Sequence, residues 1–383
     1  MRSHYACARV YLYYKKAPPF ARGFANIYDN FARDACVLIN TLLIYYHAKL
    51  YPNGKKVTVE ELKLIELHKI AFNDGDYANF FFQERLPYGR SYVLEQDGEP
   101  VSACYARFME LNLMGKELTI PFLTGVDTHP NHRYKGLARK VVEKAKESLK
   151  GEGYPFAILH PFNHDFYRKL GFETINYVKR FTPDTIKSDD VTFTAMSVDD
   201  LPLVKELYDR YMVGYKAYRL RSQKEVELLI GTSLKNGGWG YIIRQNGIPK
   251  GYVWCEDDAV AEAVCEQESL FNGVPVKHVY TIPSFNRGNH DYSMACVLDL
   301  NELFKAIPYI PNASGSVNFK INGQYYLLTI DKGIFISLTE SDSGVELSPH
   351  QVIAIALGQG DKSEVNPFEQ LIPKYNLACF EIY

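Results

Sequence analysis

One short pattern occurs twice in the chain, a helix followed by a hairpin, and this repeat restricts the fold more than any other feature. Residues 59–67 and 198–207 each combine an acidic first turn with apolar residues at helical spacing. A hairpin follows each helix, with tight turns at Asp97-Gly98 and at Asn246-Gly247. Two matches in the same order predict an internal duplication, although a generic α+β beginning would reproduce part of the pattern.

The second copy is the shorter of the two, and the end of the chain follows a different rhythm. Residues 259–271 contain no glycine-marked turn, so we predict that the second copy is degenerate. Residues 317–338 form three apolar segments separated by two turns, which predicts a three-stranded meander. Ser348 and Pro349 then begin a helix that ends at Gly358. A small α+β domain is therefore expected at the end of the chain.

Length and composition exclude several classes of protein. A chain of 383 residues predicts two or three domains, and 46% hydrophobic with 23% charged residues is typical of a globular protein. The net charge of -2 provides no general attraction for nucleic acid or anionic lipid. Seven cysteines without a C-x-x-C pair argue against a disulfide framework and favour a cytoplasmic location. The longest early apolar run, residues 35–46, is too short for a membrane span.

The segment that carries chemistry is a strand, a turn and a helix in residues 118–149. Residues 118–126 are largely apolar and β-branched, and the residues from Leu137 onward have one apolar and one charged helical face. Arg133-x-x-Gly136-x-Ala138 opens this helix, so consecutive backbone N–H groups and the helix dipole converge on a point suited to phosphate. An ordinary strand-to-helix connection with a solvated basic turn is the alternative.

Two motifs resemble the signatures of the GCN5-related N-acetyltransferases (GNAT). The first is residues 124–138, and the second is residues 166–172, in which a helix carries Tyr167 and closes at Gly171. The resemblance implies acetyl-coenzyme A as co-substrate and no metal. It also implies that the coenzyme contacts Val126, Asp127, Thr128, Arg133, Tyr134, Lys135, Gly136, Leu137, Ala138 and Arg139.

In that family the tyrosine lies beside the coenzyme sulfur, so the resemblance makes Tyr167 the general acid that protonates the leaving thiolate. A phenol with a pKa of about 10 suits this role. The backbone N–H of Val126 is expected to polarise the thioester carbonyl. Packing of the Tyr167 ring in the core is the alternative. His160 and His164, near Tyr167, are weaker candidates for acceptor contact or proton relay.

The domain order resembles the enhanced intracellular survival (Eis-like) acetyltransferases over residues 57–383. It implies tandem GNAT folds with mixed, mostly antiparallel sheets flanked by helices, at residues 57–185 (catalytic) and 186–290 (degenerate). A sterol-carrier-protein-like α+β domain would follow at 291–383. The extension at 1–56 has no assigned role. The resemblance further implies that the C-terminal carboxylate of Tyr383 is, or orients, the base, and that the protein is a ring-shaped homo-oligomer.

The expected reaction is direct acetyl transfer to a primary amine of an aminoglycoside, a polyamine or a lysine side chain. A retired GNAT scaffold that binds an apolar ligand is the main alternative, and transfer of a longer acyl chain is another. A metal site is not expected, because His129 and His132 lie in the predicted phosphate turn and lack an acidic partner at H-E-x-x-H spacing. Phe80, Phe81 and Phe82 are candidates for a wall of the acceptor pocket, or for core packing.

Overall fold

The computed structural model describes residues 58–73, 77–82, 86, 89–235, 237–256, 259–281, 290–359, 366–375 and 377–379. The chain divides at Lys63 into two compact units. In the first, the Thr58 N–H donates to the Glu61 carboxylate at 3.1 Å and the Glu61 N–H donates to Thr58 Oγ1 at 3.1 Å. This reciprocal cap begins helix α3 (Val59–Phe72). The extension expected at 1–56 lies outside the described residues.

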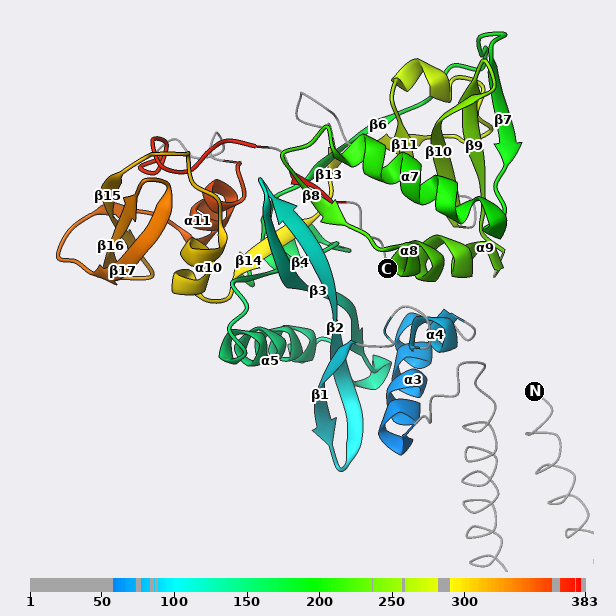
Figure 1. Cartoon of the computed structure of the whole chain (residues 1–383). Coiled ribbons are helices and arrows are strands. Elements are labelled where there is room, and N and C mark those ends of the chain that lie inside the picture. The colour runs from blue at the N-terminus through cyan, green and yellow to red at the C-terminus, as the bar shows by residue number, and fades with distance from the viewer. Residues whose placement is uncertain are drawn as a thin grey trace, which may run out of the picture. The chain divides into compact units, whose positions relative to one another are not determined.

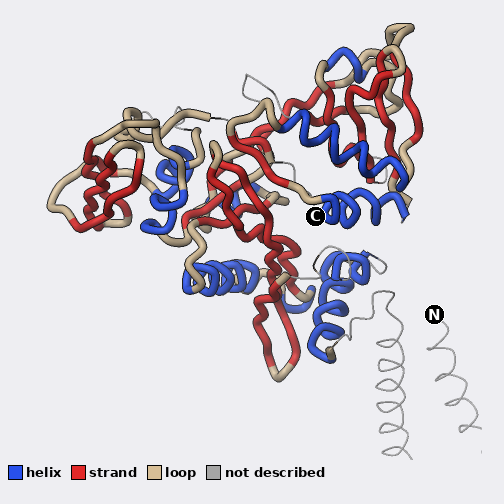
Figure 2. Tube along the Cα trace, viewed as in Figure 1, coloured by secondary structure: helices blue, strands red, loops and turns tan. Residues whose placement is uncertain are grey.

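The second unit contains a large mixed sheet in the order β19-β8-β2-β3-β4-β14-β5, with β1 paired to β2. The long antiparallel hairpin of β2 and β3 forms its centre, and β4 pairs parallel to β3 (Figures 1 and 2). Its strands are β1 (Arg90–Gln96), β2 (Glu99–Leu113), β3 (Lys116–Thr128), β4 (Phe156–Leu159), β5 (Glu173–Thr174), β8 (Ala217–Leu220), β14 (Met294–Val297) and β19 (Leu377–Ala378). Segments from three distant parts of the sequence therefore complete one sheet.

Helix α5 (Leu137–Gly151) packs on β1, β2 and β3 through its apolar face (Figure 1). The buried side chains of this face are Val141, Val142, Ala145 and Leu149, which confirms the helix predicted from the sequence. Side chains alternate between the two faces of a strand, so Cys104 and Ala106 of β2 face α5 whereas Tyr105 faces the other side. Helix α4 (Tyr77–Phe80) precedes Phe81, whose ring meets that of Tyr105.

A second sheet has the order β11-β10-β9-β7 and belongs to the second copy of the repeat. The two matching hairpins of the repeat, β1–β2 in the large sheet and β9–β10 here, are confirmed, since Asp97, Gly98, Asn246 and Gly247 all have the positive φ angles of type I′ turns. The elements here are β7 (Val191–Ala195), η4 (Val198–Asp200), α7 (Leu201–Met212), α8 (Gln223–Val226), η5 (Glu227–Gly231), α9 (Thr232–Lys235), β9 (Trp239–Gln245), β10 (Ile248–Glu256), β11 (Ala259–Cys265) and η6 (Glu268–Phe271).

Two smaller sheets complete the fold. One has the order β12-β6-β13, formed by β6 (Tyr177–Phe181), β12 (Val279–Thr281) and β13 (His290–Asp291). The other has the order β17-β16-β15-β18, and its antiparallel β15 (Gly315–Ile321), β16 (Gln324–Asp331) and β17 (Ile334–Glu340) confirm the predicted meander. This part of the chain also contains α10 (Leu300–Ala306), β18 (Val345–Glu346) and α11 (Pro349–Ala356).

Helix α11 begins as predicted, because Ser348 and Gln351 form a reciprocal cap around its first turn. The predicted α+β class, with mixed and mostly antiparallel sheets flanked by helices, is confirmed. Among the helices in the described part of the chain, none has the length and apolar character to cross a membrane.

Candidate active site

The site begins where β3 and β4 separate. These strands pair only at Phe122 with Ile158 and at Leu123 with Leu159, after which β4 ends and β3 continues to Thr128. Backbone groups along this edge of β3 are therefore not used by β4. An extended ligand can add its own hydrogen bonds to such a strand edge.

A β-bulge lies within this separated part of β3. Ala103 pairs with Asp127 and Tyr105 pairs with Thr124, so Cys104 alone opposes both Gly125 and Val126. Gly125 has a φ of +56°, and a Cβ placed on it would lie 2.7 Å from a ring carbon of Tyr105. Glycine is needed here both for its conformation and for the close approach of the tyrosine ring. The bulge redirects the backbone at Val126, the residue predicted to meet the thioester.

The predicted phosphate turn leads from the end of β3 into α5. It contains the short helix η3 (Pro130–His132), and Tyr134 and Gly136 follow with φ angles of +62° and +74°. Gly136 is the N-cap of α5 and supplies no side-chain cap. The N–H groups of the first helical turn consequently lack partners within the helix. A Cβ on Gly136 would meet nothing within 4 Å, so the approach to these donors is open.

Basic side chains surround this turn. Arg133 donates from Nη2 to the Ala71 carbonyl oxygen at 2.5 Å and from Nε to the Thr128 carbonyl oxygen at 3.3 Å. Lys135 Nζ donates to the Asn131 carbonyl oxygen at 3.3 Å. Together with the exposed Arg139 they give the turn local positive charge despite the chain's small net negative charge. The structure thus places the predicted residues 126–128 and 133–139 along one continuous edge and turn.

Tyr167 lies in the apolar core shared with α5. It belongs to α6 (His164–Arg168), where Asn163 Oδ1 accepts a hydrogen bond from the Phe166 N–H at 3.0 Å. The tyrosine is 3% exposed, and its ring centroid lies 5.0 Å from that of Phe166 and 5.8 Å from that of Phe172. Its position is rigidly defined by aromatic packing. The packing role is therefore present, and the role as general acid stays a prediction.

A buried polar cluster lies directly behind the bulge and was not predicted. His68 of α3 contacts both carboxylate oxygens of Asp127 through Nδ1, at 3.1 and 3.0 Å. The Tyr105 hydroxyl donates to Asp127 Oδ2 at 2.9 Å. All three side chains are buried. The sequence signal was a histidine on the apolar face of α3, beside Leu64 and Leu67, but its partner is 59 positions away.

Burial dominates the electrostatics of this cluster. It raises the pKa of Asp127, while hydrogen bonds from His68 and Tyr105 act in the opposite direction. Burial and the neighbouring Asp127 carboxylate both raise the pKa of Tyr105 well above its usual range, so the phenol stays protonated and remains a donor. The pKa of the Cys104 thiol is also raised by burial and by Asp127. Asp127 was predicted as a coenzyme contact, and with its carboxylate engaged only its backbone is available for one.

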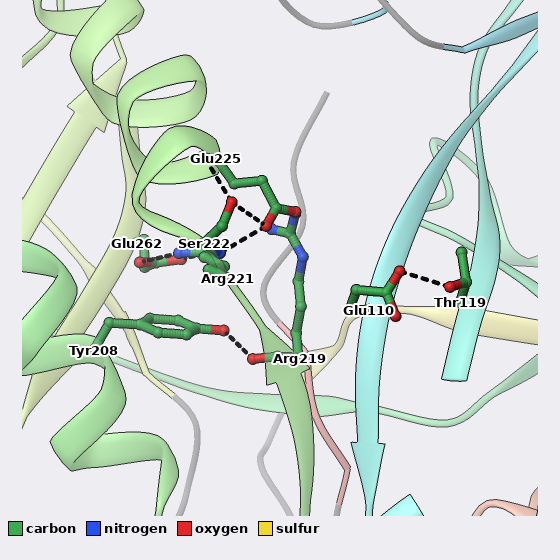
Figure 3. Close-up of polar contacts among 8 residues, drawn as sticks. All are labelled: Glu110, Thr119, Tyr208, Arg219, Arg221, Ser222, Glu225 and Glu262. Carbon is green, nitrogen blue, oxygen red and sulfur yellow. Dashed lines mark hydrogen bonds and ion pairs between the residues drawn. The ribbon is translucent and has the colours of Figure 1, made fainter. Parts of the chain in front are cut away.

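A second buried polar network lies in the second copy (Figure 3). Arg221 and Glu262 form a two-pronged ion pair at 2.8 and 2.7 Å, with side chains that are 2% and 1% exposed. Tyr252 donates to the same glutamate, and Arg221 lies 4.4 Å from the centre of the Tyr208 ring. Arg219 pairs with Glu225 at 3.1 Å. Burial lowers the pKa of Arg219 to about 10.

The last described residues, Leu377 to Cys379, lie beside β8, the strand that carries Arg219. Strand β19 pairs parallel to β8, and the Asn176 side-chain amide donates to the Cys379 carbonyl oxygen. Cys379 is buried, with Arg219 and Arg221 close enough to affect its thiol electrostatically. Tyr383, the predicted source of the base, lies outside the described residues.

The weaker candidates occupy other positions. His129 and His132 have ring centroids 5.6 Å apart in the phosphate turn, and no metal-type cluster of His, Cys, Asp or Glu occurs within the described ranges. His160 packs on Tyr292 at 4.4 Å, and burial lowers its pKa to about 4. Burial also lowers the pKa of His164. Phe81 and Phe82 are buried beside Tyr105, which is the core-packing use.

Sequence comparison identifies the domain that carries this geometry. Residues 55–175 match the family described as the acetyltransferase (GNAT) domain. These residues include α3, the bulge, the phosphate turn and Tyr167. No curated protein matches the chain. This match supports an acetyltransferase activity for the domain that contains residues 55–175.

Solved structures share the fold far beyond that domain. A probable N-acyltransferase from Enterococcus faecalis is similar with a TM-score of 0.68 at 16% identity, covering 85% of this chain and 97% of that one. A GCN5-related N-acetyltransferase from Kribbella flavida is similar with a TM-score of 0.61 at 16% identity, with the same coverages. Eis1 from Mycobacterium abscessus is similar with a TM-score of 0.59 at 12% identity, covering 85% and 98%. At these identities the likeness concerns the fold, and it agrees with the tandem arrangement.

Proposed function

We propose that this N-acetyltransferase moves the acetyl group of acetyl-coenzyme A directly to a primary amine, as found in aminoglycosides, polyamines and lysine side chains. One observation carries the proposal: the bulge at Gly125-Val126 and the open helix start at Gly136 lie at the two ends of one short segment, residues 125–136. The first suits a thioester carbonyl and the second a pyrophosphate. Their order along the chain matches the order of these groups in the coenzyme.

The described residues fit the coenzyme. The N–H groups at the start of α5 and the charges of Arg133, Lys135 and Arg139 favour a diphosphate. The unpaired edge of β3 favours the pantetheine arm, and the Val126 N–H favours the thioester oxygen. Acetyl-coenzyme A supplies the activated acyl group, and the protein orients it.

We propose Tyr167 as the general acid and the C-terminal carboxylate of Tyr383 as the base or as a group that orients it. Tyr167 is held in one position by its aromatic neighbours, as an acid that must meet a single sulfur atom requires. The last described residue, Cys379, follows strand β19 and lies four residues before Tyr383. Four extended residues span at most about 14 Å.

The Eis-like subtype extends this proposal. It assigns residues 57–185 to the catalytic domain, 186–290 to the degenerate copy and 291–383 to a sterol-carrier-like domain, in a homo-oligomeric cytoplasmic enzyme. The similarity in fold to Eis1 and the separate β15–β18 sheet support it. Strand β14 (Met294–Val297), although it begins the third segment, pairs with β4 of the catalytic sheet. The retired-scaffold alternative predicts that the phosphate turn binds no coenzyme.

Titration calorimetry with acetyl-coenzyme A tests the proposal. The variant Gly136→Asp places a carboxylate where the pyrophosphate approaches, so it should abolish binding by charge repulsion and crowding. Gly98→Asp is the matched control, because Gly98 also has a positive φ (77° against 74°) and open space around it, but lies in the β1–β2 turn. Binding by the wild type and the control, with loss in Gly136→Asp, supports the proposal. Absence of binding by the wild type favours the retired scaffold.

A further inference from the structure

In the buried cluster of His68, Asp127 and Tyr105, the histidine is arranged as a proton acceptor. Because an ionised carboxylate only accepts hydrogen bonds, the contacts of His68 Nδ1 with Asp127 place the proton of a neutral imidazole on Nδ1. Nε2 is then left with its lone pair. Within the described ranges, Nε2 has no hydrogen-bond partner. A histidine fixed through one nitrogen with the other nitrogen available is the arrangement of a general base.

The imidazole is held in a single orientation by aromatic rings. It stacks on Phe81 with centroids 4.7 Å apart and an interplanar angle of 7°. Phe82 and Tyr105 meet it edge-on at 5.8 and 6.1 Å, and Phe72 lies at 4.7 Å. The His68 side chain is 4% exposed. Because these rings fix the imidazole, less free energy is needed to position it as a catalytic group. Burial among the rings also strengthens its electrostatic effect.

The cluster adjoins the proposed thioester position. Asp127 follows Val126 directly, and the Tyr105 ring packs against Gly125 of the bulge. Ser102 Oγ donates to the Asp127 carbonyl oxygen at 2.6 Å and contacts Thr128 Oγ1 at 3.0 Å, which fixes the backbone on both sides. Tyr105 extends from the face of β2 that is opposite α5. His68 lies on this face too, with its ring centroid 6.1 Å from that of Tyr105.

We propose that His68, positioned by Asp127 and Tyr105, takes the proton of the acceptor ammonium through Nε2, directly or through one water. This inference rests on the proposed function and deepens it: His68 is the base, which leaves the Tyr383 carboxylate the orienting role of the two proposed for it. The N–H bond of the ammonium breaks as the Nε2–H bond forms, and the neutral amine attacks the thioester carbonyl. The C–N bond forms and the C–S bond breaks, the thiolate takes the proton of the Tyr167 hydroxyl, and the attacking nitrogen releases its second proton, which restores the Tyr167 hydroxyl. The imidazolium then releases its proton to solvent.

Strands β2 and β3, helix α3 and the residues after α4 surround the imidazole. Asp127 of β3 and Tyr105 of β2 contact it, Cys104 lies behind Asp127, and α3 and the residues after α4 contribute the phenylalanines. The carboxylate stabilises the imidazolium as it forms. Asp127 and Tyr105 are therefore positioning residues, whereas His68 meets the substrate.

The test compares two acceptors in wild type and His68→Gln: a primary alkylamine, which is cationic at neutral pH, and hydroxylamine, which is largely neutral and needs no base before attack. We expect His68→Gln to lower kcat/KM for the alkylamine by about 10²–10⁴-fold, the range for general-base catalysis, and to change that for hydroxylamine by less than about tenfold. Added imidazole should restore alkylamine turnover in His68→Gly. His278→Gln, a histidine that bonds Thr182 in the β6–β12 region, is the control.

Asp127→Asn is the second variant, in case His68→Gln fails to fold, and it should show a smaller loss with the same dependence on the acceptor. Equal losses with both acceptors, or unchanged kinetics in folded His68→Gln, overturn this inference alone. Acetyl-coenzyme A affinity measured on the same samples distinguishes failure of the inference about His68 from failure of the proposed function. A wild type that neither binds acetyl-coenzyme A nor acetylates either amine overturns the proposed function together with the inference.

Discussion

The two copies of the repeat each bury a tyrosine against a carboxylate, but they complete the pair differently. In the first copy Tyr105 of β2 donates to Asp127 of β3, and the third partner is His68. In the second copy Tyr252 of β10 donates to Glu262 of β11, and the third partner is Arg221. A histidine exchanges its proton near neutral pH, whereas an arginine keeps its charge. The first copy therefore carries a group suited to proton transfer, and the second a permanent ion pair.

The segments that follow the two clusters also differ, and only in the first copy does the strand lead into an open turn and a long helix. In the first copy, β3 continues into the phosphate turn and the long helix α5. In the second, β11 is followed by the short helix η6. In the described residues 259–273, no glycine leaves the start of a helix open to a ligand as Gly136 does in the first copy. Gly273 lies against the Lys187 side chain. This difference supports the proposal that the first copy holds the coenzyme and that the second is a scaffold.

Replacing one tyrosine in each copy should sharpen this comparison most strongly. Tyr167→Phe removes the proposed acid and should lower kcat by about 10²–10⁴-fold, with little change in acetyl-coenzyme A affinity. Tyr252→Phe removes a buried hydrogen bond and should reduce stability by about 1–3 kcal/mol, while folded protein keeps its turnover. Steady-state kinetics and urea unfolding on both variants measure the two effects. Normal kcat in Tyr167→Phe would remove its assigned role.

The permanent ion pair should matter for stability more than the histidine pair. Glu262→Gln leaves the buried Arg221 without its charge partner, and such a loss costs about 3–5 kcal/mol. Burial alone would lower the pKa of Arg221, but Glu262 and Tyr208 hold it well above its usual range, so the guanidinium cannot neutralise itself. Urea unfolding gives the free-energy difference. A loss below about 1 kcal/mol would contradict the structural role of this pair.

The smallest expected effect is a difference in pH dependence. Burial raises the folded-state pKa of Asp127 above 3.8, the usual value for an aspartate side chain. Its stabilising contribution is then fully present below that value and is lost as the pH rises through the folded-state pKa. The unfolding free energy of wild type minus that of Asp127→Asn should therefore fall as the pH rises above the usual pKa of an aspartate. A difference that stays constant, or grows with pH, would show that burial does not control this carboxyl.

Local signals in the sequence predicted much of the fold. The Asp-Gly and Asn-Gly turns marked both hairpins, Ser348 marked the start of α11, and the Gly136 motif marked the start of α5. These features depend on a few neighbouring residues. The turn between β3 and α5 was predictable for the same reason.

Contacts between distant segments were not predictable in this way. Nothing local in residues 217–220, 294–297 or 377–378 indicates that they extend the catalytic sheet. His68 resembles any other residue on the apolar face of α3 until Asp127 is placed beside it by the bulge. Asp127 was predicted as a coenzyme contact because it lies between two other predicted contacts, Val126 and Thr128. Only the register of β2 and β3 shows that its carboxylate faces the histidine.

The most direct test of the central claim is the acetylated amine itself, detected by mass spectrometry after incubation with acetyl-coenzyme A and a panel of primary amines. The account predicts product from the wild type and from folded Tyr252→Phe, and none from Gly136→Asp. Product formed equally well by Gly136→Asp, or product lost from folded Tyr252→Phe at unchanged coenzyme affinity, would contradict the assignment of the chemistry to the first copy.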